Sequence, residues 1–228
     1  MHRRAWPLAT VLVIAACNST PDASEPALPD ARASDAPPSA SEHEPSVSAS
    51  GVTELEATGE NLPAGRYTDA DFAPTITFDL NGDWQAVQDA TGFFDVQQRV
   101  GTPDVIAVQF ANVLEVYGDA GSVAPSDHAA AAAILSANPA FTVLGSSEAR
   151  IGGLTGSVVE IENAGDAHAS VAQVPPGALG IDPGRRLWIA FFDTDAGLLA
   201  IMVGGSTAEW QAALDAAEPV LESIQIGG

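Results

Sequence analysis

The sequence predicts an α+β domain in which a mainly antiparallel sheet has helices packed on its faces. Residues 75–80 alternate apolar and polar side chains, which is the period of a strand with one buried face. Residues 187–192 and 198–203 are almost continuously apolar, which indicates strands that are buried on both faces. An alanine-rich segment that begins at Ser126 and an amphipathic segment that begins at Ser206 have the spacing of helices.

The first half of the domain is expected to be an antiparallel meander. Asn81-Gly82 follows the strand at 75–80 and is the dipeptide most typical of a two-residue hairpin turn. A return strand at 84–89 should therefore pair with it. After another turn, two further strands are expected at 93–99 and 105–110.

The second half begins with the alanine-rich helix. This helix should end at Asn138-Pro139, because proline disfavours helical backbone in the residue before it. Beyond it, the turn residues divide the chain into short extended pieces. These pieces are strands at 141–144 and 157–162, a loop at 175–184 and a hairpin turn at 193–197 between the two apolar runs.

The last helix carries a start signal and an apolar face. Ser206 and Glu209 match the S-x-x-E capping box. Pro219 should bend this helix or end it early, since proline lacks the N–H that a helix interior needs. A short strand at 223–226 should close the domain. The expected apolar face consists of Trp210, Ala213, Leu214, Ala217 and Leu221.

Composition excludes several kinds of function. The chain has 228 residues, with 30 acidic and 8 basic side chains and a net charge of −22, and it contains no lysine. Without lysine it cannot form a P-loop or a Schiff-base enzyme. The acidic charge argues against nucleic acid as a partner and favours solubility of a secreted domain. With Cys17 as the single cysteine, an intrachain disulfide is impossible.

Residues 1–16 have the layout of a secretory signal peptide. Arg3 and Arg4 precede an apolar run at 8–16 that is shorter than the ~20 residues needed to span a bilayer. The next four-residue motif, Ile14-Ala15-Ala16-Cys17, resembles the lipobox of bacterial lipoprotein precursors. In that family the cysteine carries fatty acids such as palmitate. The resemblance implies lipidation of Cys17 and anchorage at the cell membrane or outer membrane, facing outside the cytoplasm. Ordinary signal cleavage that leaves a free thiol is the alternative.

The anchor is expected to be separated from the domain by a spacer. Residues 17–56 are predicted to hold the lipidated cysteine and a disordered tether, because Ser, Pro, Ala and acids dominate the stretch. Residues 57–228 are predicted to form one globular domain. Its loose motifs resemble secreted bacterial domains of unknown function and the PsbP-like α/β/α sandwich, whose members are mostly binding or assembly proteins. That resemblance implies a fold and no catalytic residue. It rests on Leu62–Thr68, Phe72-Ala73-Pro74, Asn138-Pro139 and Gly152–Gly156.

Several motifs are candidate sites. The glycines at 152–156 offer a backbone that could cradle a phosphate, but a tight turn or a bulge that leads into a strand is favoured. The loops at 79–83 and 193–197 have calcium-like starts, yet Ala90 stands where the first would need a bidentate Glu, so turns are favoured. His128 and His168 belong to no catalytic motif and are expected to be solvated. No cofactor or metal site is predicted.

The sequence favours a membrane-anchored, non-enzymatic lipoprotein whose domain binds an unknown partner protein or small ligand. One alternative is an envelope hydrolase that uses carboxylates, which cannot be singled out among so many acids. Another is a purely structural envelope component. A cleft with two convergent carboxylates of perturbed pKa would favour the hydrolase, and an exposed apolar patch would favour the binding protein.

Overall fold

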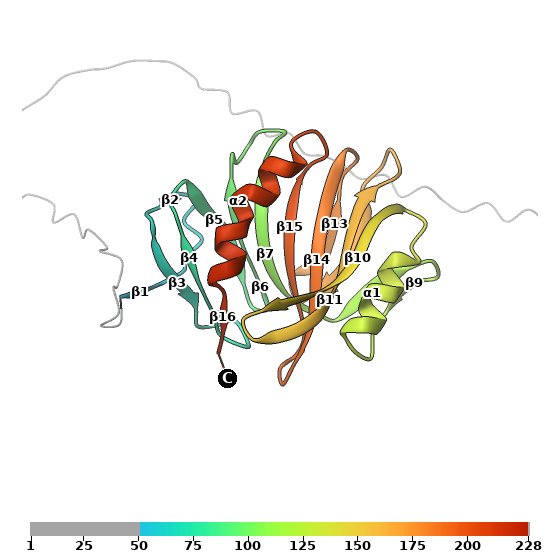
Figure 1. Ribbon diagram of the computed structural model, residues 1–228, viewed down its shortest axis with the longest axis horizontal. Helices are drawn as coiled ribbons and strands as arrows, with labels where there is room; N and C mark the ends of the chain where they lie inside the picture. The colour runs from blue at the N-terminus through green and yellow to red at the C-terminus, as the bar shows by residue number, and fades with distance from the viewer. Residues whose placement is uncertain (1–50, 228) are drawn as a thin grey trace, which may run out of the picture. The chain divides into compact units, whose positions relative to one another are not determined.

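The computed structural model describes residues 51–227, so the predicted signal peptide, Cys17 and tether residues up to 50 lie outside the described part. The described chain is organised around an eight-stranded sheet whose neighbouring strands are all antiparallel (Figure 1). In spatial order the strands are β10 (Phe141–Ile151), β11 (Leu154–Asn163), β14 (Arg185–Thr194), β15 (Gly197–Ser206), β7 (Ile106–Val113), β6 (Phe93–Gln98), β5 (Trp84–Ala90) and β2 (Asn61–Leu62).

Two smaller sheets and two helices complete the described residues. One small sheet consists of β1 (Val52–Glu54), β3 (Gly65–Asp69), β4 (Ile76–Leu80) and β16 (Gln225–Ile226). The other consists of β13 (Gly177–Ile181), β12 (Ala169–Val174), β8 (Glu115–Gly118) and β9 (Gly121–Val123). The helices are α1 (His128–Ser136) and α2 (Trp210–Ser223). Between residues 51 and 227, no helix has the length and apolar character of a membrane span.

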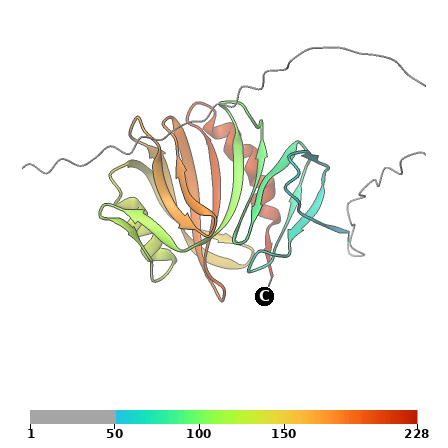
Figure 2. The same ribbon diagram turned by 180° about the vertical axis from the view of Figure 1, so that it is seen from behind.

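Each face of the central sheet has its own buried core. On one face, α2 and the β3–β4 sheet cover Phe94 and Phe110, whose ring centroids are 4.4 Å apart, and Phe78 of β4 stacks 5.4 Å from Phe110. On the other face, α1 and the β12–β13 sheet cover residues such as Phe191. Figure 2 shows the sheet from behind, with α2 on its far side. The mainly antiparallel α+β class is confirmed, but a helix and a small sheet together cover each face, rather than helices alone.

The pairing of β7 with β15 joins the two halves of the domain. Its register runs from Val113 opposite Leu198 to Ala107 opposite Gly204. The meander β5–β6–β7 lies on one side of this pairing, and β14, β11 and β10 lie on the other. The predicted hairpin between the two apolar runs is confirmed as β14–β15, and both runs are buried except for Trp188 and Leu198, which are only partly buried.

The hairpin predicted at Asn81-Gly82 is wrong. β4 pairs with β3 and β16, whereas β5 pairs with β6 and β2, so the turn links strands of different sheets. Gly82 and Asp83 both have positive φ, and the Trp84 Nε1–H donates to Asn81 Oδ1 at 3.2 Å. Asn81 and Gly82 do form a turn, as predicted, but this turn folds β4 over the face of β5 and β6. Both strands bury one apolar side, so their sequence pattern suits stacking as well as pairing.

Two segments contain more strand than the sequence indicated. The expected loop at 175–184 contains β13, which forms a hairpin with β12. The strands expected at 141–144 and 157–162 extend into an eleven- and a ten-residue strand that meet at a tight turn of Gly152 and Gly153. Residues 142–148 of β10 are exposed, so they carry no hydrophobic alternation that would have revealed the strand.

Both predicted helices are present, with different ends. Asp127, rather than Ser126, caps α1, and its side chain accepts the Ala130 N–H at 2.8 Å. Ser206 accepts the Glu209 N–H at 3.2 Å, but Glu209 is the N-cap residue and makes no side-chain cap bond, so the capping box is wrong. Pro219 lies inside α2, which continues to Ser223 instead of ending early. The buried face is Trp210, Ala213, Ala217 and Val220, and Leu214 and Leu221 are only half-buried.

The ordered domain starts before residue 57. β1 pairs in parallel with β3, and the Leu55 N–H donates to the Thr68 carbonyl at 2.7 Å. Leu55 is fully enclosed in the core. Residues 52–55, which composition assigned to the tether, therefore belong to the domain. A three-residue strand with one apolar anchor is too short to show a periodic pattern.

Trp210 tests the packing of α2. It is 7% exposed and packs over Gly205, where a Cβ would lie 3.3 Å from its ring. Trp210→Ala should therefore lower the free energy of unfolding by about 3–5 kcal/mol, as expected for a large aromatic lost from a core. Gln211→Ala, on the exposed side of the same helix, should change it by no more than about 0.5 kcal/mol. Urea unfolding measures both, and equal midpoints for Trp210→Ala and wild type would contradict the packing.

Candidate functional site

A groove lies beside α2 on the face of the central sheet that this helix covers in part. α2 packs over β15 and β7, and β14, β11 and β10 extend beyond it (Figure 1). The groove has a volume of about 450 Å³, within the range of ligand sites. Its apolar lining consists of Ala149, Ile151, Trp188, Leu214 and Leu221.

Strand register places Trp188 on the floor of the groove. Trp188 of β14 pairs with Glu160 of β11, and the neighbouring Leu187 faces the opposite core. Because successive side chains alternate across a strand, Trp188 must face α2. No helix or small sheet covers it completely, so Trp188 packs against the core but stays only partly buried. The two leucines of α2 that the sequence assigned to the core form the facing wall instead.

Glycines at the tip of the β10–β11 hairpin bring it against β16. Gly152 has positive φ, and a Cβ there would lie 2.6 Å from Cγ1 of Ile226. A bridge joins Gly152 to Gln225. A Cβ at Gly156 would lie 2.1 Å from the Phe191 carbonyl oxygen. The glycine cluster is thus a tight turn and a close backbone approach, as favoured from the sequence, and it curls β10 and β11 toward the end of α2.

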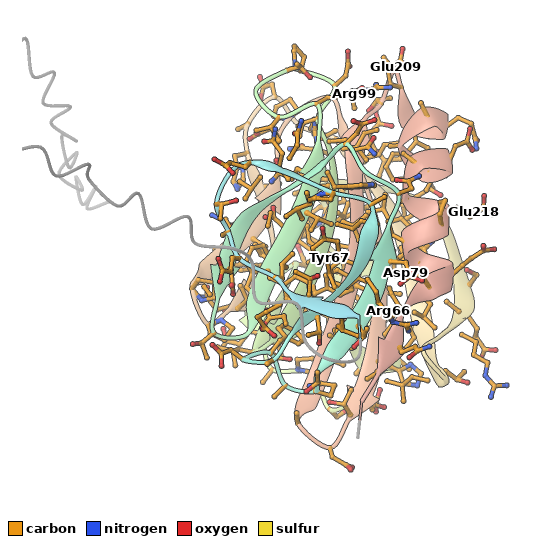
Figure 3. All side chains as sticks on the ribbon, turned by 90° about the vertical axis from the view of Figure 1, so that its left-hand side faces the viewer. Arg66, Tyr67, Asp79, Arg99, Glu209 and Glu218 are labelled. Atoms are coloured by element: carbon orange, nitrogen blue, oxygen red, sulfur yellow. The ribbon has the colours of Figure 1, made fainter. Side chains whose placement is uncertain are left out.

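The walls of the groove are acidic. Asp215, Glu218 and Glu222 line it at helical spacing along α2, and Glu218 projects outward from the helix (Figure 3). Arg150 is the one basic side chain in its lining. Further along the same sheet face, Arg186 donates to Glu162 at 3.0 Å and lies 3.8 Å from Glu160, which leaves that trio with one net negative charge. The groove therefore combines an apolar floor with a negative rim.

A more voluminous hollow is less suited to hold a ligand. It has a volume of about 720 Å³ and lies between residues 70–75, the β14–β15 turn and the C-terminal strand. Turn and loop residues form most of its wall, and Phe72, its one aromatic residue, is itself buried in the core. It has no partly exposed aromatic ring like that of Trp188, and no row of acidic side chains like the one that α2 gives the groove.

The calcium-like loops serve as turns. Asp193 accepts the backbone N–H of His128 at 2.9 Å, and Thr194 donates to the Gly197 carbonyl at 2.8 Å across the β14–β15 turn. Asp79 lies 3.8 Å from Arg66 beside α2 (Figure 3). Among residues 51–227, no three His, Cys, Asp or Glu side chains are grouped as metal ligands would be.

The two histidines have partners that the sequence did not reveal. His128 Nδ1 lies 2.9 Å from Ser157 Oγ, and its Nε2 lies 3.8 Å from Asp193 Oδ2. These are the residue types of a serine hydrolase, but the separation from Asp193 exceeds a hydrogen bond, and Asp193 already holds the first N–H of α1. The trio attaches α1 to the sheet. His168 is exposed and pairs with Asp182 at 2.9 Å.

Two buried carboxyl groups stand out from the many exposed acids. Asp95 is 1% exposed, and its carboxylate accepts the Gln88 N–H at 2.9 Å, beside the bulge in β5. Burial raises its pKa. Asp69 is 2% exposed at the end of β3 and accepts the N–H groups of Asp71 and Phe72, both at 3.0 Å. Burial, and then the charge of Asp89, raise the pKa of Asp69 to about 6.

These carboxyl groups do not form the convergent pair that a hydrolase would need. Burial also raises the pKa of Asp89, but neither Asp69 nor Asp89 lines the groove or the two larger hollows of the described residues. Asp69 holds a turn through its two accepted N–H groups. The site that the geometry singles out is the groove, whose residues belong to no sequence motif.

The chain matches no protein-family model and no curated protein. Among solved structures, it is similar to a PsbP protein from the cyanobacterium Synechocystis sp. PCC 6803, with 10% identity, coverage of 74% of this chain and 93% of that one, and a TM-score of 0.41. It is similar to LpqN, involved in cell envelope biogenesis of Mycobacterium tuberculosis, with 12% identity, coverage of 74% and 91%, and a TM-score of 0.37.

A third similar structure comes from Bacteroides thetaiotaomicron, with 10% identity and a TM-score of 0.36. The match covers 67% of this chain but only 45% of that protein. A PsbP protein is thus among the similar structures, as the sequence motifs suggested. At these identities and TM-scores, the likeness carries neither a family nor a function to this chain.

Asp69 should make the stability of the domain depend on pH. A folded-state pKa of about 6, above the ordinary value of 3.8, means that the folded state binds the proton more tightly than the unfolded state. Stability from this group is therefore lost as pH rises from about 4 through 6. Asp69→Asn should raise the melting temperature at pH 7.5 and have little effect at pH 4.

The control for this experiment is Asp195→Asn, which removes an exposed carboxylate of the β14–β15 turn. The pKa values of Asp89 and Asp95 are raised as well. The contribution of Asp69 is therefore given by the difference in melting temperature between Asp69→Asn and wild type at each pH. If Asp69→Asn changed the melting temperature by the same amount at both pH values, burial of the ionised Asp69 carboxylate would not destabilise the wild-type protein at neutral pH.

Proposed function

We propose that this protein is a membrane-tethered binding protein whose domain lies outside the cytoplasm and holds a basic amphipathic segment of a partner protein in the groove beside α2. The observation that carries the binding role is Trp188, which is only partly buried on an apolar floor beneath an acidic wall. Aromatic side chains in hollows are typical anchors of protein interfaces.

The charge of the groove selects the class of partner. Asp215, Glu218 and Glu222 stand on one wall against the single Arg150. A segment with Lys or Arg along one side and apolar residues along the other would meet both the rim and the floor. The wall is long enough for such a segment, because the 14 residues of α2 extend for about 21 Å.

The proposal of an anchor and a tether depends on the sequence of residues 1–50, which lie outside the described part. The support for them is the signal-peptide layout and the position of the single cysteine at the end of Ile14-Ala15-Ala16-Cys17. A diacylated cysteine would give stable attachment, since two acyl chains hold a protein to a bilayer where one gives only marginal binding. Residues 18–50 would then let the domain reach partners away from the surface.

Cys17→Ser tests the anchor. Serine cannot form the thioether to the lipid, so this variant should incorporate no labelled palmitate and should leave the membrane fraction. Wild-type chain expressed in parallel is the reference, and Ser19→Ala, two residues further on, controls for changes near the cleavage site. Equal palmitate incorporation by Cys17→Ser and wild type would rule out lipidation at this cysteine.

Charge reversal on α2 tests the groove. The probe is a synthetic helical peptide of leucine and lysine, titrated against the mature chain at low and at physiological salt. The double variant Asp215→Lys/Glu218→Lys should weaken binding about tenfold, and so should Trp188→Ala. The double variant Asp195→Lys/Glu209→Lys makes the same change in net charge at exposed positions outside the groove lining, and it should bind as wild type. Equal weakening by this control would mean that the peptide responds only to net charge.

A further inference from the structure

A second hollow lies on the opposite face of the central sheet from the groove. It has a volume of about 520 Å³, and Leu187 lines it, whereas the next residue, Trp188, lines the groove. Consecutive strand residues point to opposite faces, so the two hollows are separated by the thickness of the sheet. The lining of this second hollow is largely polar side chains and backbone, unlike the groove.

The floor of the second hollow follows from strand register. Gln97, Ala107, Gly204 and Leu187 stand opposite one another on β6, β7, β15 and β14, so they form one row across the sheet. The two central members of the row have little or no side chain, whereas the neighbouring row contains Gln109 and Met202. A row with small residues between large ones leaves a depression.

Packing does not require glycine at position 204. Its φ is not in the left-handed region, and a Cβ there would meet Leu187 and Ala107 at ordinary contact distances of 3.9 and 4.0 Å. Gly205, by contrast, has to be small, because a Cβ there would lie 2.6 Å from Cβ of Ala213 in α2. Gly204 therefore keeps open a space that the fold itself could fill.

A buried carboxylate fixes an amide side chain at this floor. Gln97 and Gln109 line the hollow, and Gln97 Nε2 donates to Asp95, which is itself buried. Because a carboxylate only accepts hydrogen bonds, the Gln97 amide must turn its NH2 group toward Asp95. The Gln97 amide oxygen is then free to accept a hydrogen bond from a ligand in the hollow, and Gln109 adds a second amide to the same floor.

The rim of the hollow is also held in place. Arg185 donates from Nη1 to the Pro103 carbonyl at 3.1 Å and from Nη2 to the Val105 carbonyl at 2.9 Å. Ser206 donates to Asp104 in the same loop at 2.9 Å. The wall between β6 and β7 is thus fastened to β14 and β15, and the hollow needs no rearrangement to accept a ligand.

We infer that this second hollow binds a neutral, hydroxyl-rich ligand the size of one or two sugar units. The amides of Gln97 and Gln109 supply hydrogen-bonding groups for hydroxyls, and the small accessible edges of Leu187 and Ile181, which are otherwise buried, border them. Neither arginine of the lining has an unpaired charge for an anion, because Asp104 and Asp182 offset the charge of Arg185, and Glu160 and Glu162 pair with Arg186. The site is independent of the groove and of its basic partner.

Side-chain NMR signals provide a direct test on the full mature chain. The probes are glucose, N-acetylglucosamine and, as an anionic counterpart, glucuronic acid, each at millimolar concentration against 15N-labelled protein. A neutral sugar should shift the NH2 signals of Gln97 and Gln109 in a saturable way. Glucuronic acid should produce shifts only at about tenfold higher concentration.

Variants of Gly204 separate binding from folding. Gly204→Val should fill the depression and weaken sugar binding at least about tenfold. Gly204→Ala should weaken it less, with a melting temperature no lower than that of wild type, because a Cβ at this position meets only ordinary contacts. Trp188→Ala should leave sugar binding unchanged, and Gly204→Val should leave peptide binding in the groove unchanged, so the two sites can fail separately.

Three results would overturn the inference. The first is the absence of any sugar-dependent shift at Gln97 and Gln109. The second is equal sugar binding by wild type and a folded Gly204→Val variant. The third is a stronger response to glucuronic acid than to the neutral sugars, which would make the hollow an anion site instead.

Discussion

The antiparallel pairing of β7 with β15 is the interaction on which the rest of the structure depends. It joins a meander from the first half of the chain to a hairpin from the second, and it places Phe110 in one core and Ala111 in the other. Neither half could bury both of its faces alone, because the layers that cover each face come from both halves: β4 and α2 on one side, β8 and β12 on the other. The loop-closure entropy of this distant pairing must be offset by both cores together.

Both hollows arise where the covering layers stop. A sheet of eight strands is wider than a helix and a four-stranded sheet can cover. On one face α2 ends short of β14, β11 and β10, and Trp188 is left only partly buried. On the other face the β12–β13 sheet covers one end of β6 and β7 but not the end that holds Gln97 and Gln109, which line a depression. Because regular strands hold these side chains, their geometry is fixed by the sheet rather than by loops.

The strands that the sequence predicted well are those whose burial leaves a strong signal. The continuous apolar runs of β14 and β15 could hardly be anything but buried strands, and the alanine-rich segment of α1 has clear ends. The Asn81-Gly82 turn was recognised, but a turn fixes only the local reversal of the chain, and whether the strands then pair or stack is decided by long-range packing. The candidate sites could not be predicted from the sequence. Which neighbours surround Trp188, Gln97 and Gln109, and whether these side chains reach the surface, depends on cross-strand register and on where a covering layer ends.

The adjacent glycines of β15 show how one short segment controls both faces of the sheet. Gly205 faces α2 and has no room for a Cβ beside Ala213, so it sets how closely the helix approaches and hence how wide the groove beside it is. Gly204 faces the other way and has room for a Cβ, so its lack of a side chain sets the depth of the second hollow instead. In a strand buried on both faces, a glycine costs conformational entropy and makes no side-chain contacts. Gly205 is explained by the close approach of α2. Gly204 has no such explanation in the fold, and a ligand in the second hollow would provide one.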